Sequence, residues 1–435
     1  MAQQLKPDAA WRKILNDTPQ LLVSTSSGNT CQIEAQTIKQ YREPRLMTKH
    51  DTQESVPEPL KKEKLGVLSV SRSRYEIGQL ELFHTFESIE RIRPERIQLK
   101  HYETLPVDAI ASESNAINAL TLSGALDSFL DTPPNDETFN GRMSTGQFEF
   151  DINNPAARTG KSHISVDRAQ LEIDAGFEND DSIIIMEAKN VIHDNFNVHQ
   201  LYYPYRRYFG KVKKPIRLVF SQYTDFTYNL YEYRFEDPNN YSSIQLVRNG
   251  VYTFSDQQIT ADDLAHLRET TPVRTDDNQE CTEIPFIQAD RFDRIISLME
   301  RLNGLEPGCG MTTSEIAQFM GTTDRQAGYY PAAGEYLGVF TRGRNYAELS
   351  KIGRQIMACN YYDRQRRLAE LMFQHATLNE AYRAMISNGR IPSQVEIVSI
   401  MLSHNVCNGK STVERRAQSV IGWMKWLQSL TDEDL

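Results

Sequence analysis

The sequence predicts a multidomain α/β (α+β) protein, in which a mixed sheet flanked by helices precedes a C-terminal half that is mostly helical. The chain has 435 residues, which is too long for one ordinary hydrophobic core. Residues 170–220 read as strand, strand, helix and strand, an order that implies a mixed sheet with helices on its faces. Residues 313–349 read as two short helices followed by a basic β-hairpin, which suggests a separate unit.

We expect four units along the chain: residues 1–105, 106–284, 285–360 and 361–435. The first should have a structural or DNA-clamping role, with a helix around Trp11, a strand near Cys31 and two strands in residues 66–78. Residues 46–66 are charged and carry two prolines, so they read as a long loop. The others are expected to be a nuclease-like catalytic unit, a helix-turn-helix unit and a helical unit.

Composition excludes several classes of protein. The formal net charge is −10, which is not typical of a nucleic-acid binder, although basic residues outnumber acidic ones between Glu306 and Leu430. No apolar stretch approaches the ~20 residues that span a bilayer, and the N-terminus lacks the apolar core of a signal peptide, so a cytoplasmic location is expected. The cysteines are scattered singly, which argues against a disulfide framework and a structural zinc site.

The most informative stretch is residues 170–190, which read as a charged β-hairpin. Asp174 lies on its first strand, and Glu187 and Lys189 lie on its second. With a two-residue turn at 180–181, residues equally distant from the turn stand opposite each other, so Asp174 faces Glu187 and Glu172 faces Lys189. Two carboxylates and an ammonium group then converge on one patch.

Such a patch suits a hard divalent cation. Carboxylate oxygens, here from Asp174, Glu187 and Glu172, are ligands of Mg²⁺, which usually keeps several waters for chemistry on phosphates. Lys189 can orient or deprotonate the attacking water, particularly if burial lowers its pKa. The alternative is a cross-strand salt bridge on a solvated face. Residues 182–186 are apolar on both faces, however, which indicates a buried strand whose terminal charges are costly unless paired or bound to metal.

This pattern resembles the PD-(D/E)xK nuclease superfamily, and within it the type II restriction endonucleases. The resemblance implies that Asp174 and Glu187 hold Mg²⁺ and that Lys189 serves the attacking water. Ile173 stands where the superfamily usually has proline. The resemblance also implies a mixed-sheet nuclease core, double-stranded DNA as substrate, a homodimer, and a cognate DNA methyltransferase that protects host DNA.

Four further residues of the catalytic unit are candidates for the site. Glu113 lies in the first turn of an expected helix, and in the resembled superfamily an acidic residue on an early helix sometimes completes the metal shell. Glu113 also suits a purely structural role, favouring the helix dipole. Gln200, Arg206 and Arg207 lie on the helix after the hairpin, and the resemblance implies that Gln200 and Arg206 orient Lys189 or bind the scissile phosphate. The alternative is an aromatic-rich helix packed on the sheet, with its arginines solvated.

Residues 285–360 read as a winged helix-turn-helix. An amphipathic helix over 284–302 links this unit to the catalytic one, and a short helix over 314–319 follows. Asp324 is expected to cap a second helix over 325–337, which Pro331 would kink. The hairpin after this helix would form the wing.

Basic and amide side chains on these elements suit DNA. Arg325 and Gln326, at the start of the second helix, can read guanine and adenine in the major groove. Arg342 and Arg344 on the wing can reach phosphates or the minor groove. The alternative is that the unit is a protein-interaction module, a role that winged helices also serve.

Residues 361–435 read as a second helical unit, and a second winged helix is one interpretation of it. A capping box is expected at 411–414, opening a C-terminal helix with Arg415 and Arg416 at its start. This helix is either a second recognition helix or a packing helix whose arginines are only solvated. Its apolar side is formed by Val420, Ile421, Trp423, Met424 and Leu427.

Together these features predict a Mg²⁺-dependent, sequence-specific endonuclease of the type II restriction class. The competing interpretations are a non-catalytic DNA-binding regulator, in which the hairpin is only scaffold, and a repair or defence nuclease without sequence preference. The recognition sequence does not follow from a list of residues, because base choice depends on docking geometry.

Overall fold

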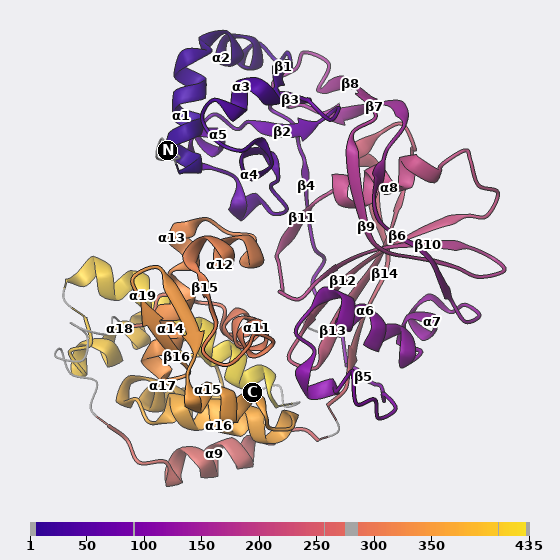
Figure 1. Ribbon diagram of the computed structural model, residues 1–435. Helices are drawn as coiled ribbons and strands as arrows, with labels where there is room; N and C mark the ends of the chain where they lie inside the picture. The colour runs from indigo at the N-terminus through magenta and orange to yellow at the C-terminus, as the bar shows by residue number, and fades with distance from the viewer. Residues whose placement is uncertain (1–5, 90–91, 256, 275–285, 408, 432–435) are drawn as a thin grey trace.

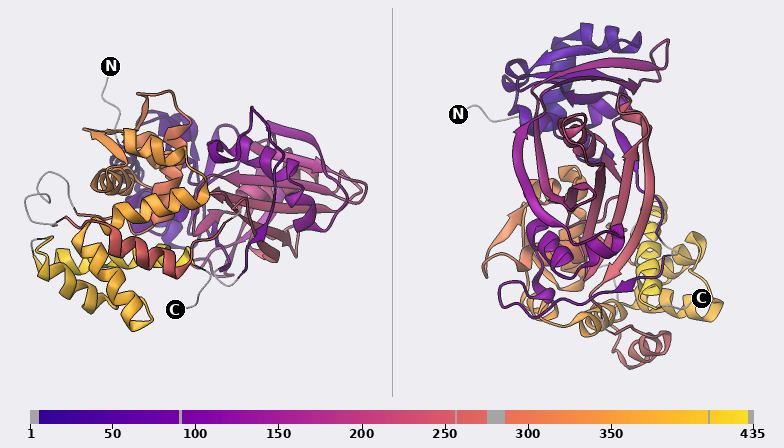
Figure 2. Two further views of the ribbon diagram at one scale, coloured as in Figure 1. Left: turned by 90° about the horizontal axis from the view of Figure 1, so that it is seen from below. Right: turned by 90° about the vertical axis from the view of Figure 1, so that its right-hand side faces the viewer.

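A seven-stranded mixed sheet with many helices around it forms the centre of the chain, which confirms the expected mixed α/β class (Figure 1). The computed structural model describes residues 6–89, 92–255, 257–274, 286–407 and 409–431. The N-terminal unit lies at one end of the sheet and the C-terminal helices lie at the other, as the right-hand view of Figure 2 shows. Within the described ranges, no helix has the length and apolarity needed to cross a membrane.

Short helices surround a three-stranded sheet of order β1-β3-β2 in the N-terminal unit. Trp11 lies fully buried in its core, and the indole N–H donates to the carbonyl of Met47 at 2.9 Å. The elements are α1 (Pro7–Asp17), α2 (Pro19–Ser26), β1 (Cys31–Glu34), α3 (Ala35–Lys39), α4 (Pro44–Thr48), η1 (Gln53–Ser55), α5 (Glu58–Lys62), β2 (Gly66–Ser69) and β3 (Arg74–Gly78).

Residues 46–66 are not one long loop as the charge and the prolines suggested. The end of α4, the turn η1 and the helix α5 occupy much of this segment. Pro59 stands in the first turn of α5, where its missing N–H leaves no helical bond unmade. At η1, Thr52 and Ser55 bond each other's backbone N–H groups in a capping box.

The central sheet has the strand order β5-β14-β13-β12-β10-β9-β6. β10 and β12 run parallel and are connected through α8 (His199–Tyr208), whereas β9 pairs antiparallel with both β10 and β6. The order strand, strand, helix, strand therefore builds the mixed sheet that it predicted. The strands are β5 (Glu95–Arg96), β6 (Asp136–Ser144), β9 (Gln170–Glu178), β10 (Ile183–Lys189), β12 (Ile216–Thr224), β13 (Thr227–Phe235) and β14 (Ile244–Thr253).

Both faces of this sheet are covered. α6 (Glu113–Leu122) and α7 (Ala125–Leu130) pack on one face, against Ile184 and Met186. They replace the single helix expected over 112–130, because Gly124 between them has a φ of +74°. The other face carries α8 and the hairpin of β7 (Gln147–Asn153) and β8 (Lys161–Asp167). Smaller elements are β4 (Phe83–Thr85), η2 (Val107–Ala109), β11 (Asn195–Asn197), η3 (Tyr241–Ser243) and α9 (Ala261–Thr270).

The hairpin of β9 and β10 has the predicted register. Ile183 stands opposite Glu178, and Met186 stands opposite Ala175. Asn179 closes the connection, since its side-chain oxygen accepts the backbone N–H groups of residues 181 and 182 at 2.8 Å each. Every residue of β10 except Lys189 is buried, as its apolar run indicated.

One hydrophobic core runs through the C-terminal part of the chain and includes residues on both sides of the boundary expected at 360. α11 lies between this helical part and the central sheet (Figure 1). The elements are α11 (Phe292–Asn303), β15 (Gly310–Thr312), α12 (Thr313–Met320), α13 (Asp324–Ala327), α14 (Tyr329–Leu337), β16 (Phe340–Gly343), β17 (Tyr346–Leu349), α15 (Lys351–Met357), α16 (Tyr361–Phe373), α17 (Ala376–Asn388), α18 (Gln394–Ser403) and α19 (Lys410–Ser429).

Three helix starts differ from the predictions. α11 begins at Phe292 rather than near residue 284. The helix expected over 325–337 is split at Gly328 into α13 and α14, and Thr323 rather than Asp324 caps it. Ser411 is no cap, because α19 already begins at Lys410. α11 and α19 begin without a side-chain cap, so capping residues alone did not locate these starts.

A buried cluster of charged side chains links the C-terminal helices to the central sheet. The guanidinium group of Arg364 on α16 lies 3.3 Å from Glu300 on α11 and 3.7 Å from Asp225 at the β12–β13 turn. Glu300 also accepts the backbone N–H of Asp225 at 3.1 Å. Burial raises the pKa of Glu300 to about 7 and that of Asp225 to about 6, although Arg364 opposes both shifts.

Candidate active site

Asp174 lies where the pairing of β9 becomes irregular. The register of β6 against β9 shifts between Phe139 and Gly141, so Asp174 and Ala175 share the width of one residue on β6. A bulge of this kind redirects a side chain and interrupts regular pairing. The Asp174 carboxylate reaches β10, where Oδ2 accepts the backbone N–H of Ala188 at 2.9 Å. The aspartate is therefore fixed against the strand that carries Glu187 and Lys189.

Glu187 and Lys189 form a close buried pair at the end of β10. Lys189 Nζ lies 2.6 Å from Glu187 Oε1, and the side chains are only 14% and 9% exposed. Gln200, in the first turn of α8, donates from Nε2 to the same Glu187 oxygen at 2.6 Å. Glu113 at the start of α6 approaches Lys189 Nζ to 3.7 Å. The structure thus brings together five predicted site residues, counting Asp174, from four separate elements.

The charges of this group decide the protonation of Lys189. Burial alone lowers the pKa of Lys189, but the carboxylates of Glu187, Glu113 and Asp174 outweigh it, and the pKa lies well above its usual value. Burial and the charge of Asp174 both raise the pKa of Glu187. The surroundings of Lys189 therefore raise its pKa overall, although burial acts in the opposite direction. The carboxylates around Lys189 favour the protonated ammonium form.

One carboxylate oxygen of Glu187 and one of Asp174 accept no hydrogen bond from the described residues, and we call these oxygens open. Both hydrogen bonds that the described residues make to Glu187 go to Oε1, and the one made to Asp174 goes to Oδ2. The buried Gln200 Oε1 likewise has no partner among the described residues. Open carboxylate oxygens fit Mg²⁺, which takes one or two protein carboxylates and keeps several waters. Within the described ranges, no three His, Cys, Asp or Glu side chains already surround a metal position. The open oxygens make Asp174 and Glu187 the candidate ligands.

The N-terminal unit supplies a carboxylate that the sequence did not single out. Asp51 Oδ2 lies 3.5 Å from Lys49 Nζ, and the Asp51 carbonyl accepts the N–H of Asn197 on β11 at 2.8 Å. Burial raises the pKa of Asp51, but the charges of Lys49 and Lys189 outweigh it and lower the pKa. The charge of Lys189 therefore acts on the Asp51 carboxylate. No motif marks it, because only the fold brings residues 49–53 against β11.

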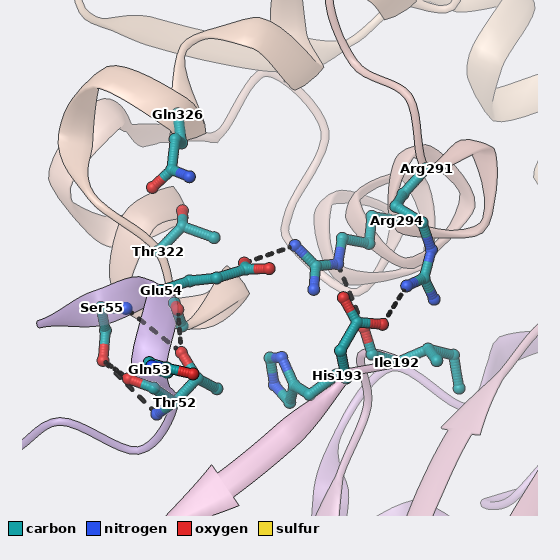
Figure 3. Close-up of polar contacts among 12 residues, drawn as sticks. Thr52, Gln53, Glu54, Ser55, Ile192, His193, Arg291, Arg294, Thr322 and Gln326 are labelled. Atoms are coloured by element: carbon teal, nitrogen blue, oxygen red, sulfur yellow. Dashed lines mark hydrogen bonds and ion pairs between the residues drawn. The ribbon is translucent and has the colours of Figure 1, made fainter. Parts of the chain in front are cut away.

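The loop after Lys189 is braced from two directions (Figure 3). Arg294 on α11 donates to the Ile192 carbonyl at 3.1 Å, and its Nη1 lies 2.9 Å from Glu54 Oε2 of the N-terminal unit. At the neighbouring contact, the hydroxyl of Thr52 donates to the carbonyl of Gly321, which caps α12. A Cβ added at Gly321 would come within 3.1 Å of the His193 ring and 3.0 Å of Thr52. Three parts of the chain therefore meet at this loop.

Two predicted site residues lie elsewhere. Glu172 pairs with Arg142 on the edge strand β6, Oε1 to Nε 3.1 Å, and its side chain is 45% exposed. The structure does not bring it to Lys189. Arg206 Nη1 donates to the hydroxyl of Tyr202 at 2.9 Å and the carbonyl of Pro238 at 2.8 Å, and it lies over the Phe148 ring. The role expected for Arg206 at the scissile phosphate is therefore wrong, because the aromatic packing around α8 holds its guanidinium group.

The predicted DNA-binding residues are placed as follows. Arg207 lies half-buried in the last turn of α8. Arg342 Nε is paired with Glu335 Oε2 at 2.8 Å, whereas Arg344 is exposed at the tip of the β16–β17 hairpin. Arg325 and Gln326 on α13 line the same cavity as Arg415 and Arg416 on α19, although some 90 positions separate the two pairs in the sequence.

Comparison with known proteins divides the chain into three parts. Family models match residues 8–77, described as Domain of unknown function (DUF6996), residues 78–253, described as Domain of unknown function (DUF6997), and residues 294–432, described as Domain of unknown function (DUF7226). No curated protein and no solved structure matches the chain. The first division falls at 77/78 rather than near 105, and the third match extends across residue 360, as the shared C-terminal core does.

Proposed function

We propose that this chain is a Mg²⁺-dependent endonuclease that hydrolyses phosphodiester bonds of double-stranded DNA at a specific sequence, like the type II restriction enzymes with a PD-(D/E)xK core. The observation that carries the proposal is the group formed by Asp174, Glu187, Lys189 and Gln200. A buried ammonium lies 2.6 Å from one carboxylate, while a second carboxylate is fixed on the strand backbone. Each carboxylate keeps an open oxygen, which a structural ion pair does not require and a cation site does.

Each side chain then has a distinct task. Asp174 and Glu187 would hold the metal ion through their open oxygens. When bound, Mg²⁺ lowers the pKa of a water molecule and offsets negative charge on the phosphate. Lys189 would donate to the attacking water or to a non-bridging phosphate oxygen, which orients the water or offsets negative charge on the phosphate. Gln200 fixes Glu187 through the 2.6 Å hydrogen bond.

The reaction is the addition of water across one P–O bond. The water oxygen forms a bond to phosphorus, the bond to the leaving oxygen breaks, and that oxygen takes a proton. One such group cuts one strand, so cleavage of both strands requires a homodimer or two successive cuts.

Sequence recognition is assigned in this proposal to the C-terminal unit acting as a winged helix-turn-helix. α12 and α13 are short, capped helices joined by residues 321–323, and the hairpin of β16 and β17, the expected wing, follows α14. β15, which precedes α12, pairs with β17 and completes a three-stranded sheet. Arg325 is exposed at the start of α13, and Arg344 is exposed on the wing. Arg342 is less available, because Glu335 already pairs with it.

A plasmid cleavage assay tests the proposal. We expect discrete fragments with Mg²⁺, none with EDTA, and a loss of activity of at least ~100-fold in Lys189→Ala and Asp174→Ala. Lys214→Ala is the matched control, since Lys214 makes a similar 2.6 Å pair with Glu178 at the opposite end of the hairpin. Cutting by the two site variants at the wild-type rate would refute the assignment. A smear would indicate a nuclease without sequence preference, and DNA binding without cutting would indicate a regulator.

A further inference from the structure

A cavity of about 710 Å³ opens between α11, the helices α13 and α14, and α19. Its wall includes Arg325, Gln326 and Tyr329 from one side and Arg415 and Gln418 from the other. The volume is within the range of ~300–1,000 Å³ that small-ligand sites have. Arg325 with Gln326 and Arg415 with Arg416, which the sequence presented as separate features, therefore converge on one space of ligand size.

The arginines of this cavity fall into two groups. Arg291 and Arg294 are engaged, since Arg291 pairs with Asp293 and Asp194 and Arg294 pairs with Glu54. A further arginine of the wall, Arg416, also has a partner.

Arg325 and Arg415 differ from these. Both are exposed, and neither forms an ion pair with the described residues. The one hydrogen bond that Arg325 makes there is a weak one, 3.3 Å from Nε to the Tyr329 hydroxyl. Two carboxylates of the wall, Asp290 and Glu414, are exposed as well. Neither of these two acids pairs with an arginine of the wall. The guanidinium groups of Arg325 and Arg415 therefore remain available for bidentate contact with an anion such as phosphate.

Amide groups and aromatic rings complete the wall. The side-chain oxygen of Gln326 accepts from Thr323 at the start of α13, at 2.9 Å, which leaves the amide nitrogen of Gln326 as a donor. In Figure 3, Gln326 and Thr322 lie above the pair of Glu54 and Arg294. Tyr329 adds a half-exposed ring. An amide donor and a ring next to arginine forks are the groups that hold a base and its phosphate.

The cavity also reaches the candidate active site. Asp194, which follows Lys189 by five positions, lines the cavity and pairs with Arg291. Arg294, another wall residue, holds the carbonyl of Ile192. A ligand in this cavity would therefore contact side chains that brace the loop after the active-site lysine.

We propose that this cavity binds one phosphate-bearing nucleotide of the DNA substrate, with Arg325 and Arg415 on the phosphate and Gln326 and Tyr329 toward the base. The inference rests on the proposed function for its source of nucleotides. A free mononucleotide carries the same phosphate and base as a nucleotide of the DNA substrate. The test therefore includes both sources.

The experiment measures binding of a labelled DNA duplex in EDTA, so that no cleavage occurs, over a series of salt concentrations. For Arg325→Ala/Arg415→Ala we expect at least ~10-fold weaker binding, with the slope of log K against log salt reduced by ~0.9, because both arginines are placed on the same phosphate. The control is Arg234→Ala/Arg383→Ala, two arginines that are 65% and 61% exposed outside the cavity. It should bind like the wild type.

Three outcomes would overturn the inference: equal binding and slope in the cavity variant, an equal loss in the control, or mononucleotide binding that needs these arginines while duplex binding does not. Arg325→Lys/Arg415→Lys, which keeps both charges, should retain the slope and part of the affinity, and it guards against a folding defect. Failure of the proposed function is separable. If the wild type binds DNA through these arginines but does not cut with Mg²⁺, the nuclease proposal fails and the cavity assignment stands.

Discussion

Replacing Arg294 with methionine should loosen the loop after Lys189 without altering the active-site side chains. Arg294 is 3% exposed and donates to Glu54, to the carbonyl of Ile192 and, at 3.3 Å, to the hydroxyl of Tyr330. Methionine keeps most of the apolar stem and removes every donor. The carbonyl of Ile192 then loses its donor inside the protein.

The structure sets the size of the effect. A hydrogen bond to a charged group contributes about 1.5–3 kcal/mol. The Glu54 side chain is 29% exposed, so solvent screening places its share at the low end of that range. We expect a loss of about 3 kcal/mol in the free energy of opening of the loop, which corresponds to a roughly 150-fold loss of protection from hydrogen exchange.

Native-state hydrogen exchange measures this directly. The N–H of Asn197, which donates to the Asp51 carbonyl, and the N–H of His193, which donates to Gln222 at 2.6 Å, report on the loop. Arg301→Met is the matched control, because Arg301 lies on the same helix and its side chain makes no hydrogen bond or ion pair with the residues that the structure describes. The reasoning is refuted if Arg294→Met changes protection by less than about 3-fold, or no more than Arg301→Met does.

Three shorter predictions follow from other sites. Gly321→Ala should lower the melting temperature more than Gly389→Ala, because both glycines have φ near +60° but only Gly321 lacks room for a Cβ; equal losses would contradict the contact at Gly321. Since burial raises the pKa of Glu300 to about 7, the folded chain holds a proton that the unfolded chain releases above about pH 4.5. Stability from this group is therefore lost as the pH rises towards 7, and Glu300→Gln should reduce the slope of the free energy of unfolding against pH, between pH 5 and 7, by about 1 kcal/mol per pH unit; an unchanged slope would exclude this source. Arg206→Ala should cost about 2 kcal/mol of stability yet leave DNA cleavage per folded molecule unchanged; a cleavage defect like that of Lys189→Ala would return Arg206 to the site.

Local signals in the sequence were sufficient for the central hairpin. The polar residues at 179–182 and the apolar run behind them determine both the turn and the burial of β10, so the register follows. The alternation of strand side chains also placed Glu187 and Lys189 on one face, whereas Gln200 joined the predicted site through the resemblance to the PD-(D/E)xK nucleases. The structure brings the three side chains together. Neighbouring residues carry most of this information.

Long-range contacts decided what the sequence did not predict. Arg206 looked like a phosphate ligand, yet the carbonyl of Pro238 and the ring of Phe148 hold its guanidinium group. Glu172 instead pairs with Arg142 on the edge strand β6, and no sequence pattern predicted that β6 pairs with β9. Asp51 comes from a segment that read as a loop, and Asn197 on β11 holds that segment through hydrogen bonds to the carbonyls of Asp51 and His50. Each of these depends on which segments meet in three dimensions.

The brace on the loop after Lys189 has a consequence for synthesis of the protein. Thr52 and the Gly321 that it contacts are separated by 269 positions, so a ribosome makes the first long before the second. Domains generally fold as they emerge, starting from the N-terminus. The candidate site is therefore present on the nascent chain before α11 and α12 exist to hold its loop. For a DNA-cutting enzyme this order would delay full activity until the recognition unit is complete, so an unfinished chain would be a poor nuclease.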